Sequence, residues 1–305
     1  MRIPTRVVIR EVAPRDGLQG ERVIIPTAEK VQLVDMLSAA GFTKINVASF
    51  VSPKAVPQMA DAHDVFASIS KKENVIYDAT VPNVKGAQRA IDAGVDATVV
   101  FVAASEAGNK SGVGRTTEES MVEAEEVVRL TRAAGLFAMG TVATAFGSPY
   151  GEEIDVDRVA QLVTRFVNAG ATAVALGDTS GEANPKQVRT TVARLLNEHP
   201  SLELSMHFHD TRGMAVANTL AAMEAGVTNF DSATGGIGGS PFTKDSAGNL
   251  ATEELLYLCD SMGIETGIDF GLAIDAYNFL ADVLKRSLPS RVGRLYRTES
   301  ESKND

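Results

Sequence analysis

The chain has 305 residues, of which 44% are hydrophobic and 22% charged, as is ordinary for a globular protein that buries a full core. Its formal charge of −10 argues against nucleic acid as the main partner, and no apolar run approaches the ~20 residues that span a bilayer. One cysteine excludes a disulfide within the chain. The first residues lack the apolar run of a secretory signal, so we expect a cytoplasmic protein without a membrane or nucleic-acid partner.

Short β-branched segments alternate with longer segments of helical periodicity along nearly the whole chain. Glu29–Ala40 and Val156–Ala169 show the helical pattern, with apolar residues three and four positions apart. This alternation is typical of repeated βα units and a parallel sheet. The predicted strands are Val7–Val12, Lys44–Phe50, Val75–Val81, Ala97–Ala103, Phe137–Thr144, Ala173–Asp178, Glu203–His209 and Asn229–Ala233.

Alanine-glycine pairs precede several of these strands, and glycine suits the left-handed position that ends a helix. Eight strands with their helices predict an α/β protein, a (β/α)8 TIM barrel in a single domain spanning 1–305. We place the barrel at about 7–262, an additional C-terminal helical extension at about 267–288, and a flexible tail at 298–305. A doubly wound open sheet is the weaker alternative, because no glycine-rich dinucleotide turn follows the first strand. The pairs are Ala40-Gly41, Ala93-Gly94, Ala134-Gly135, Ala169-Gly170 and Ala225-Gly226.

Polar side chains gather where the predicted strands end, which is where TIM barrels place their active sites. The most informative pair is His207 and His209, because residues two apart on a strand point to the same face. Two imidazoles there can bind one metal ion. Asp16, at the end of the first strand, and Asn249 add oxygen ligands, and this mixed set suits Mg²⁺ or Mn²⁺ better than a closed zinc site.

Two further features flank this predicted metal site. Arg15 precedes Asp16, and a fixed guanidinium there can stabilise an enolate; an ion pair with Asp16 or Asp178 is the alternative. The glycine-rich segment from Gly235 to Phe242 follows the eighth strand and is interpreted as a lid. It lacks the lysine of a phosphate-binding loop, and an ordinary flexible loop is the alternative.

Several stretches resemble one known family of enzymes. They cover about residues 7 to 262, and the chain resembles the hydroxymethylglutaryl-CoA lyase branch of the metal-dependent TIM-barrel lyases and synthases. The synthases usually carry Gly-Glu-Arg where this chain has Gly239-Ser240-Pro241, so the resemblance favours the lyases. The matching stretches are Pro14–Gln19, Ser49–Lys54, Val56–Met59, Leu176–Thr179, His207–Thr211 and Gly248–Glu253.

The resemblance implies roles for individual residues and a partner molecule. It implies an acyl-CoA substrate, a divalent metal and a homodimer. The segment Ala103–Thr116 is similar to the segment that contacts CoA. The implied metal ligands are Asp16, His207, His209 and Asn249; the implied catalytic and supporting residues are Arg15, His207, Asp178, Ser240 and Glu253; the expected substrate contacts are Gln19, Asn46, Thr179, Lys110 and Arg115.

Two positions depart from the family pattern. Ser240 stands where the lyases have a cysteine in the glycine-rich segment, and Asn46 stands where they have a glutamate in the second strand. A serine hydroxyl is far less acidic than a thiol, and an asparagine cannot act as a base. These changes motivate the hypothesis that the substrate is a related 3-hydroxyacyl-CoA, such as citramalyl-CoA or 3-methylmalyl-CoA.

The implied chemistry is a metal-assisted retro-Claisen cleavage of a carbon–carbon bond. In it, a base removes the substrate hydroxyl proton, and His207 or a water in the site is the candidate. Asp178 either orients that water or supports its neighbours. Arg15 stabilises the enolate, and Ser240 or a water returns the proton. The alternatives are a Claisen-type synthase, a CoA-free aldolase, and a barrel that binds acyl-CoA or metal without turnover.

Overall fold

The computed structural model describes residues 3–239 and 248–302 and contains a closed barrel of parallel strands, in the order β1 to β8. The predicted TIM barrel is thereby confirmed, and each strand lies within one or two residues of its predicted bounds. The strands are β1 (Val8–Glu11), β2 (Lys44–Ser49), β3 (Ile76–Thr80), β4 (Ala97–Ala103), β5 (Phe137–Ala143), β6 (Ala173–Asp178), β7 (Glu203–Phe208) and β8 (Asn229–Ser232).

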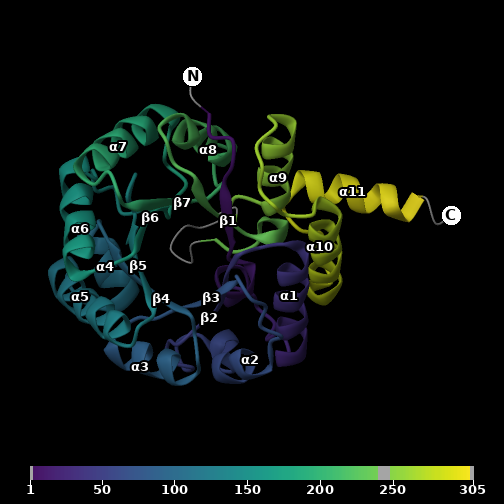
Figure 1. The fold of residues 1–305 in the computed structure, drawn as a ribbon, viewed down its shortest axis with the longest axis horizontal. Coiled ribbons are helices and arrows are strands. Elements are labelled where there is room, and N and C mark those ends of the chain that lie inside the picture. The colour runs from purple at the N-terminus through teal and green to yellow at the C-terminus, as the bar shows by residue number, and fades with distance from the viewer. Residues whose placement is uncertain (1–2, 240–247, 303–305) are drawn as a thin grey trace.

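Helices form a ring outside the barrel (Figure 1). They cover the strands with their apolar faces, because parallel strands are buried on both sides. Shorter turns are the π-helical turn η1 (Ala13–Gly17) and the 3₁₀ turns η2 (Pro57–Met59) and η3 (Thr234–Gly236). The α-helices are α1 (Thr27–Ala40), α2 (Ala62–Ser68), α3 (Val84–Asp92), α4 (Glu106–Val113), α5 (Thr117–Ala133), α6 (Val156–Ala169), α7 (Pro185–Glu198), α8 (Ala215–Glu224), α9 (Thr252–Ser261), α10 (Phe270–Leu284) and α11 (Arg291–Ser302).

The predicted alanine-glycine helix stops are present at the turns that lead into the strands. All five glycines have φ between 77° and 107°. Gly41 and Gly170 occupy the left-handed C-cap positions of α1 and α6. Because L-residues with a side chain rarely adopt this conformation, glycine at these positions ends the helix and turns the chain toward the next strand.

The C-terminal region departs from the sequence prediction. The expected extension is present as α10, but a further helix, α11, follows it and projects away from the barrel (Figure 1). It contains the first five residues of the tail that was predicted to fray. Ser290 accepts a hydrogen bond from the Gly293 N–H at 2.8 Å, and Tyr296 packs edge-on against Phe270 of α10. This cap and this tertiary contact stabilise the first turns of α11, which precede the residues that were predicted to fray.

Among the described residues, every helix is too short or too polar to cross a bilayer.

Candidate metal centre and active site

A π-helical turn at the end of β1 presents the first two site residues. The N–H groups of Arg15, Asp16 and Gly17 all donate to the carbonyl of Val12, at 3.2, 2.7 and 3.3 Å. The turn buries the Asp16 carboxylate at the barrel mouth and leaves Arg15 partly accessible. Such turns are rare and occur mainly at functional sites.

The two histidines at the end of β7 face the same centre. Their Nε2 atoms lie 3.2 Å apart, and their ring centroids 5.1 Å apart. The ligand atoms of Asp16, His207 and His209 all lie within 4.8 Å of one another. The predicted spacing of two residues on a strand therefore does bring both imidazoles to one face.

Asn249 joins this cluster through backbone pairing that only the folded chain provides. It forms an antiparallel bridge with His209, and Leu250 N–H donates to the Phe208 carbonyl at 2.9 Å. The Asn249 Nδ2 donates to Asp16 Oδ2 at 2.9 Å and to the Ile237 carbonyl at 3.0 Å. Its Oδ1 is buried and has no hydrogen-bond partner among the residues that the structure describes.

These four residues fit a divalent metal ion. Two nitrogens 3.2 Å apart match adjacent ligands of one ion at about 2.1 Å each. Burial raises the pKa of Asp16, but Arg15, the two histidines and Asn249 outweigh it and hold the pKa at about 2. Burial and the neighbouring His207 lower the pKa of His209 to about 4. A carboxylate and a neutral imidazole are the forms that bind metals. Asn249 Oδ1, which has no partner within residues 3–239 and 248–302, would supply a further oxygen.

Arg15 is fixed between the metal cluster and β2. Its Nη1 donates to Asp16 Oδ1 at 2.5 Å, and its Nε donates to Asn46 Oδ1 at 2.7 Å. The ion pair with Asp16, which was the alternative to a role in stabilising an enolate, is thus present, and it leaves the guanidinium at the edge of the site. Gln19 also donates to Asp16 Oδ1, at 2.9 Å. Of the two residues predicted to contact substrate, Gln19 therefore lies beside the metal ligand Asp16, and Asn46 lies beside Arg15.

Asp178 is engaged by the loop that follows β6. Its carboxylate accepts the N–H groups of Glu182 and Ala183, at 2.9 and 3.1 Å. Burial raises its pKa to about 6, although these two hydrogen bonds oppose the shift. Thr179 accepts the N–H of Thr144 at 2.9 Å. These contacts favour the supporting interpretation of Asp178 over the orientation of a water.

Glu253 holds the turn from which the glycine-rich segment begins. Both of its carboxylate oxygens accept the Gly235 N–H, at 3.0 and 3.1 Å. Burial, reinforced by nearby Glu254, raises the pKa of Glu253 to about 8. This contact agrees with the predicted supporting role. Ser240, the predicted proton donor, lies outside the described residues.

Lys110 and Arg115 do not join the metal cluster. Lys110 lies on α4 with its side chain 60% exposed, 3.4 Å from Glu106. Arg115 follows α4 and is 3.1 Å from Glu123. The expected CoA segment is therefore a helix and a short turn, with these cations at the surface.

The sequence analysis missed three charged residues inside the barrel. Arg10, Asp78 and Asp231 are each at most 6% exposed. Asp231 contacts one of the metal ligands, since its Oδ2 lies 3.1 Å from His207 Nδ1. Each of the three interrupts a predicted apolar strand, and a charge at an inward strand position was the signal that could have revealed them.

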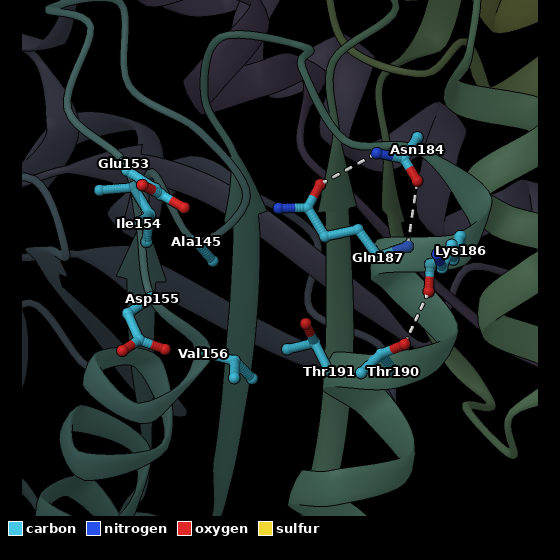
Figure 2. Close-up of a pocket in the computed structure, with 10 residues that line it drawn as sticks. All are labelled: Ala145, Glu153, Ile154, Asp155, Val156, Asn184, Lys186, Gln187, Thr190 and Thr191. Atoms are coloured by element: carbon cyan, nitrogen blue, oxygen red, sulfur yellow. Dashed lines mark hydrogen bonds between the residues drawn. The ribbon is translucent and has the colours of Figure 1, made fainter.

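A surface cleft elsewhere contains none of the predicted site residues. It has a volume of about 790 Å³ and lies between the segment before α6 and the first turns of α7 (Figure 2). Glu153 and Asp155 lie on one side of it, and Lys186 and Gln187 on the other (Figure 2). Acidic side chains lie on one side of the cleft and a lysine on the other. Because none of the predicted site residues lines it, the cleft is not part of the site at the barrel mouth.

Comparisons with known proteins agree with this geometry. The model of the HMGL-like family matches residues 6–280. The chain is 41% identical to mitochondrial hydroxymethylglutaryl-CoA lyase of Rattus norvegicus, over 96% of this chain and 90% of that one. It is 38% identical to hydroxymethylglutaryl-CoA lyase YngG of Bacillus subtilis, over 95% and 97%.

Solved structures give the same result. The HMG-CoA lyase of Bacillus subtilis superposes with a TM-score of 0.95 at 37% identity, covering 97% of this chain and all of that one. An HMG-CoA lyase of Acinetobacter baumannii, in complex with coenzyme A and 3-methylmalate, superposes with a TM-score of 0.92 at 38% identity, covering 96% of each chain. With a family match over nearly the whole barrel, the chain belongs to the HMGL-like family.

Proposed function

We propose that this protein is a carbon–carbon lyase that cleaves a 3-hydroxyacyl-CoA by a metal-assisted retro-Claisen reaction. The observation that carries the proposal is the convergence of Asp16, His207, His209 and Asn249 on one centre, with Arg15 bonded to Asp16. The family membership and the coenzyme A bound by the Acinetobacter relative support the acyl-CoA class.

The four clustered residues would hold Mg²⁺ or Mn²⁺, whose preference for oxygen and imidazole ligands they match. When bound, such an ion lowers the pKa of a coordinated hydroxyl and orients its carrier. The protein contributes a fixed ligand geometry, because the hydrogen bonds of Asp16 and Asn249 restrict their side chains. The metal identity, a homodimeric assembly and a cytoplasmic location stay predictions.

Arg15 is placed to stabilise the negative charge that appears when the carbon–carbon bond breaks. Breaking that bond leaves an electron pair on the carbon next to the thioester, delocalised as an enolate. The guanidinium is held at two points, by Asp16 and Asn46, so it needs little reorganisation to meet that charge. Its position beside Asp16 puts it next to a substrate that occupies the metal site.

The proton transfers are assigned from the remaining geometry. The Nε2 of His207 faces His209 and the metal cluster, and its Nδ1 faces Asp231, so neither nitrogen would be free if His207 held an ion. This favours a water in the site, rather than His207, as the base that takes the hydroxyl proton. Ser240 or a water then returns a proton to the enolate, by resemblance to the family.

The substrate is proposed to differ from hydroxymethylglutaryl-CoA. Asn46 accepts from Arg15 and donates to Asp78, so it contributes no negative charge beside the guanidinium. A smaller branched malyl-CoA, such as citramalyl-CoA or 3-methylmalyl-CoA, would then place its carboxylate there, giving a 2-oxo acid and a short acyl-CoA. The 3-methylmalate bound by the Acinetobacter relative supports this class.

Mass spectrometry of CoA products tests the proposal. Purified protein with Mg²⁺ or Mn²⁺ is given hydroxymethylglutaryl-CoA, citramalyl-CoA and 3-methylmalyl-CoA, with a chelator as control. We expect metal-dependent cleavage, fastest for a malyl-type substrate. The double variant Asn46→Glu, Ser240→Cys should raise turnover of hydroxymethylglutaryl-CoA; if it does not, these residues do not set the substrate. No metal-dependent product from any of the three would overturn the proposed lyase.

A further inference from the structure

A belt of buried polar side chains crosses the barrel beneath the metal cluster. The belt comes from five neighbouring strands, β7, β8, β1, β2 and β3. Its members, in that order, are His207, Asp231, Arg10, Asn46 and Asp78. Asp231 on β8 is in register with Arg10 on β1 on one side and with His207 on β7 on the other. The barrel interior of this fold is ordinarily filled by branched apolar side chains, so a layer of charges here needs a reason.

One half of the belt reaches the metal ligand His207. Arg10 donates from Nε to Asp231 Oδ1 at 2.9 Å and from Nη2 to Oδ2 at 2.6 Å. The same Asp231 Oδ2 lies 3.1 Å from His207 Nδ1. A carboxylate at Nδ1 fixes the ring and places the proton on that nitrogen, which leaves the Nε2 lone pair directed at the metal centre. Arg10 in turn fixes the carboxylate by a two-point contact.

The other half reaches Arg15. Arg10 Nη1 lies 3.6 Å from Asp78 Oδ2, and Asp78 accepts a hydrogen bond from the Asn46 amide. The Asn46 Oδ1 then accepts from Arg15 Nε at 2.7 Å. Asn46 is fully buried and Thr80 Oγ1 also donates to its Oδ1, at 3.3 Å, so its amide orientation is set by these partners. Arg10 is thus the cation between two buried carboxylates, each of which supports a different part of the site.

We propose that Arg10 is a positioning residue that sets both the ring of His207, through Asp231, and the guanidinium of Arg15, through Asp78 and Asn46. The inference rests on the proposed metal-dependent function, but its first readouts need no turnover. Removing Arg10 outright would leave two buried carboxylates uncompensated and risks loss of folding. Milder variants therefore carry the test: Asp231→Asn, Asp78→Asn and Arg10→Lys, which keeps the charge and loses the two-point contact.

The first arm measures the His207 side of the belt. Long-range ¹H–¹⁵N NMR of the metal-free protein reports which nitrogen of each histidine carries the proton, and a His207→Gln variant assigns the signal. We expect the Nδ1-protonated form in the parent protein and a mixture in Asp231→Asn. Mn²⁺ affinity, measured by competition with a fluorescent chelator, should fall about 10- to 100-fold in Asp231→Asn and less in Arg10→Lys.

The second arm measures the Arg15 side. Asp78→Asn should lower kcat about tenfold or more, because Asn46 would then hold the Arg15 guanidinium less firmly. It should leave Mn²⁺ affinity within about threefold of the parent, because Asp78 does not support the metal ligands. Asp61→Asn is the matched control. Asp61 accepts from Lys30 at 2.6 Å, in an ion pair away from the belt, so its loss costs stability without altering the tautomer, the affinity or kcat.

Two results would overturn the proposal. One is an unchanged His207 tautomer and unchanged Mn²⁺ affinity in Asp231→Asn and Arg10→Lys. The other is an equal loss of Mn²⁺ affinity in Asp78→Asn and Asp231→Asn, since the two halves would then not be separate. A parent protein that binds Mn²⁺ with the expected tautomer effects but cleaves no acyl-CoA supports the His207 half and refutes only the proposed function.

Discussion

Replacing Glu253 with glutamine should change how the stability of the protein depends on pH. Burial raises the pKa of Glu253 from 4.5 to about 8 in the native state, and the charges of Glu254 and Glu11 add to this while the Gly235 N–H opposes it. The native state therefore keeps a proton between those pH values that the unfolded state has released. The free energy of unfolding falls as pH rises from about 4.5 to 8, and this contribution is constant above that range.

The size of the effect follows from the same values. One pKa unit corresponds to about 1.4 kcal/mol, so a rise from 4.5 to about 8 sets an upper bound of about 5 kcal/mol. Relaxation around a buried carboxylate reduces this bound, and we expect roughly 2–5 kcal/mol. Glutamine has nearly the same shape and cannot ionise. Glu253→Gln should therefore gain stability relative to the parent as pH rises.

Equilibrium urea unfolding at pH 5.5, 7.0 and 8.5, with a chelator present, measures this difference. The chelator removes the pH dependence of metal binding, and other ionisable groups cancel between parent and variant. The control is Glu126→Gln, because Glu126 is an exposed glutamate of α5 and its removal should leave the curves parallel. Parallel curves for Glu253→Gln as well would refute the reasoning, since Glu253 would then be ionised in the native state throughout.

Three further outcomes follow from the site geometry. Asp16→Asn should weaken Mn²⁺ binding at least about tenfold, measured by calorimetric titration, and an unchanged affinity would remove Asp16 from the ligand set. Gly238→Ala should lower kcat about 100-fold in a folded protein. Gly238 has a φ of +101°, and an added Cβ would lie 2.5 Å from Asn249 Nδ2. Normal kinetics would contradict the close packing of the two residues. Asn109→Ala should lower the free energy of unfolding in urea by about 2–3 kcal/mol and raise KM for the acyl-CoA, because the buried side chain bonds Ala103, Thr116 and Ser120. A loss below about 0.5 kcal/mol would show that these hydrogen bonds do not hold the segment.

The barrel could be predicted from the sequence because its strands and helix ends depend on local residue patterns. Parallel strands buried on both faces appear as continuous β-branched runs, and glycine was required where a helix ended in the left-handed conformation, as at Gly41. The two histidines were predictable for the same kind of reason, because strand geometry alone puts His207 and His209 on one face. Helix α11 was not predictable from its polar composition, since its contact with Phe270 comes from a different element.

Other parts of the site depended on contacts between residues far apart in the chain. The sequence could nominate Asn249 as an oxygen ligand, but only the bridge to His209 explains how it reaches Asp16. The pairing of Arg10 with Asp231 joins residues 221 positions apart, and strand register, which is fixed by closure of the barrel, decides it. The sequence by itself thus determined the fold class and the face of the histidines, because both follow from local periodicity. The tertiary structure alone decided which buried charges meet, because that depends on the register of strands that no local pattern specifies.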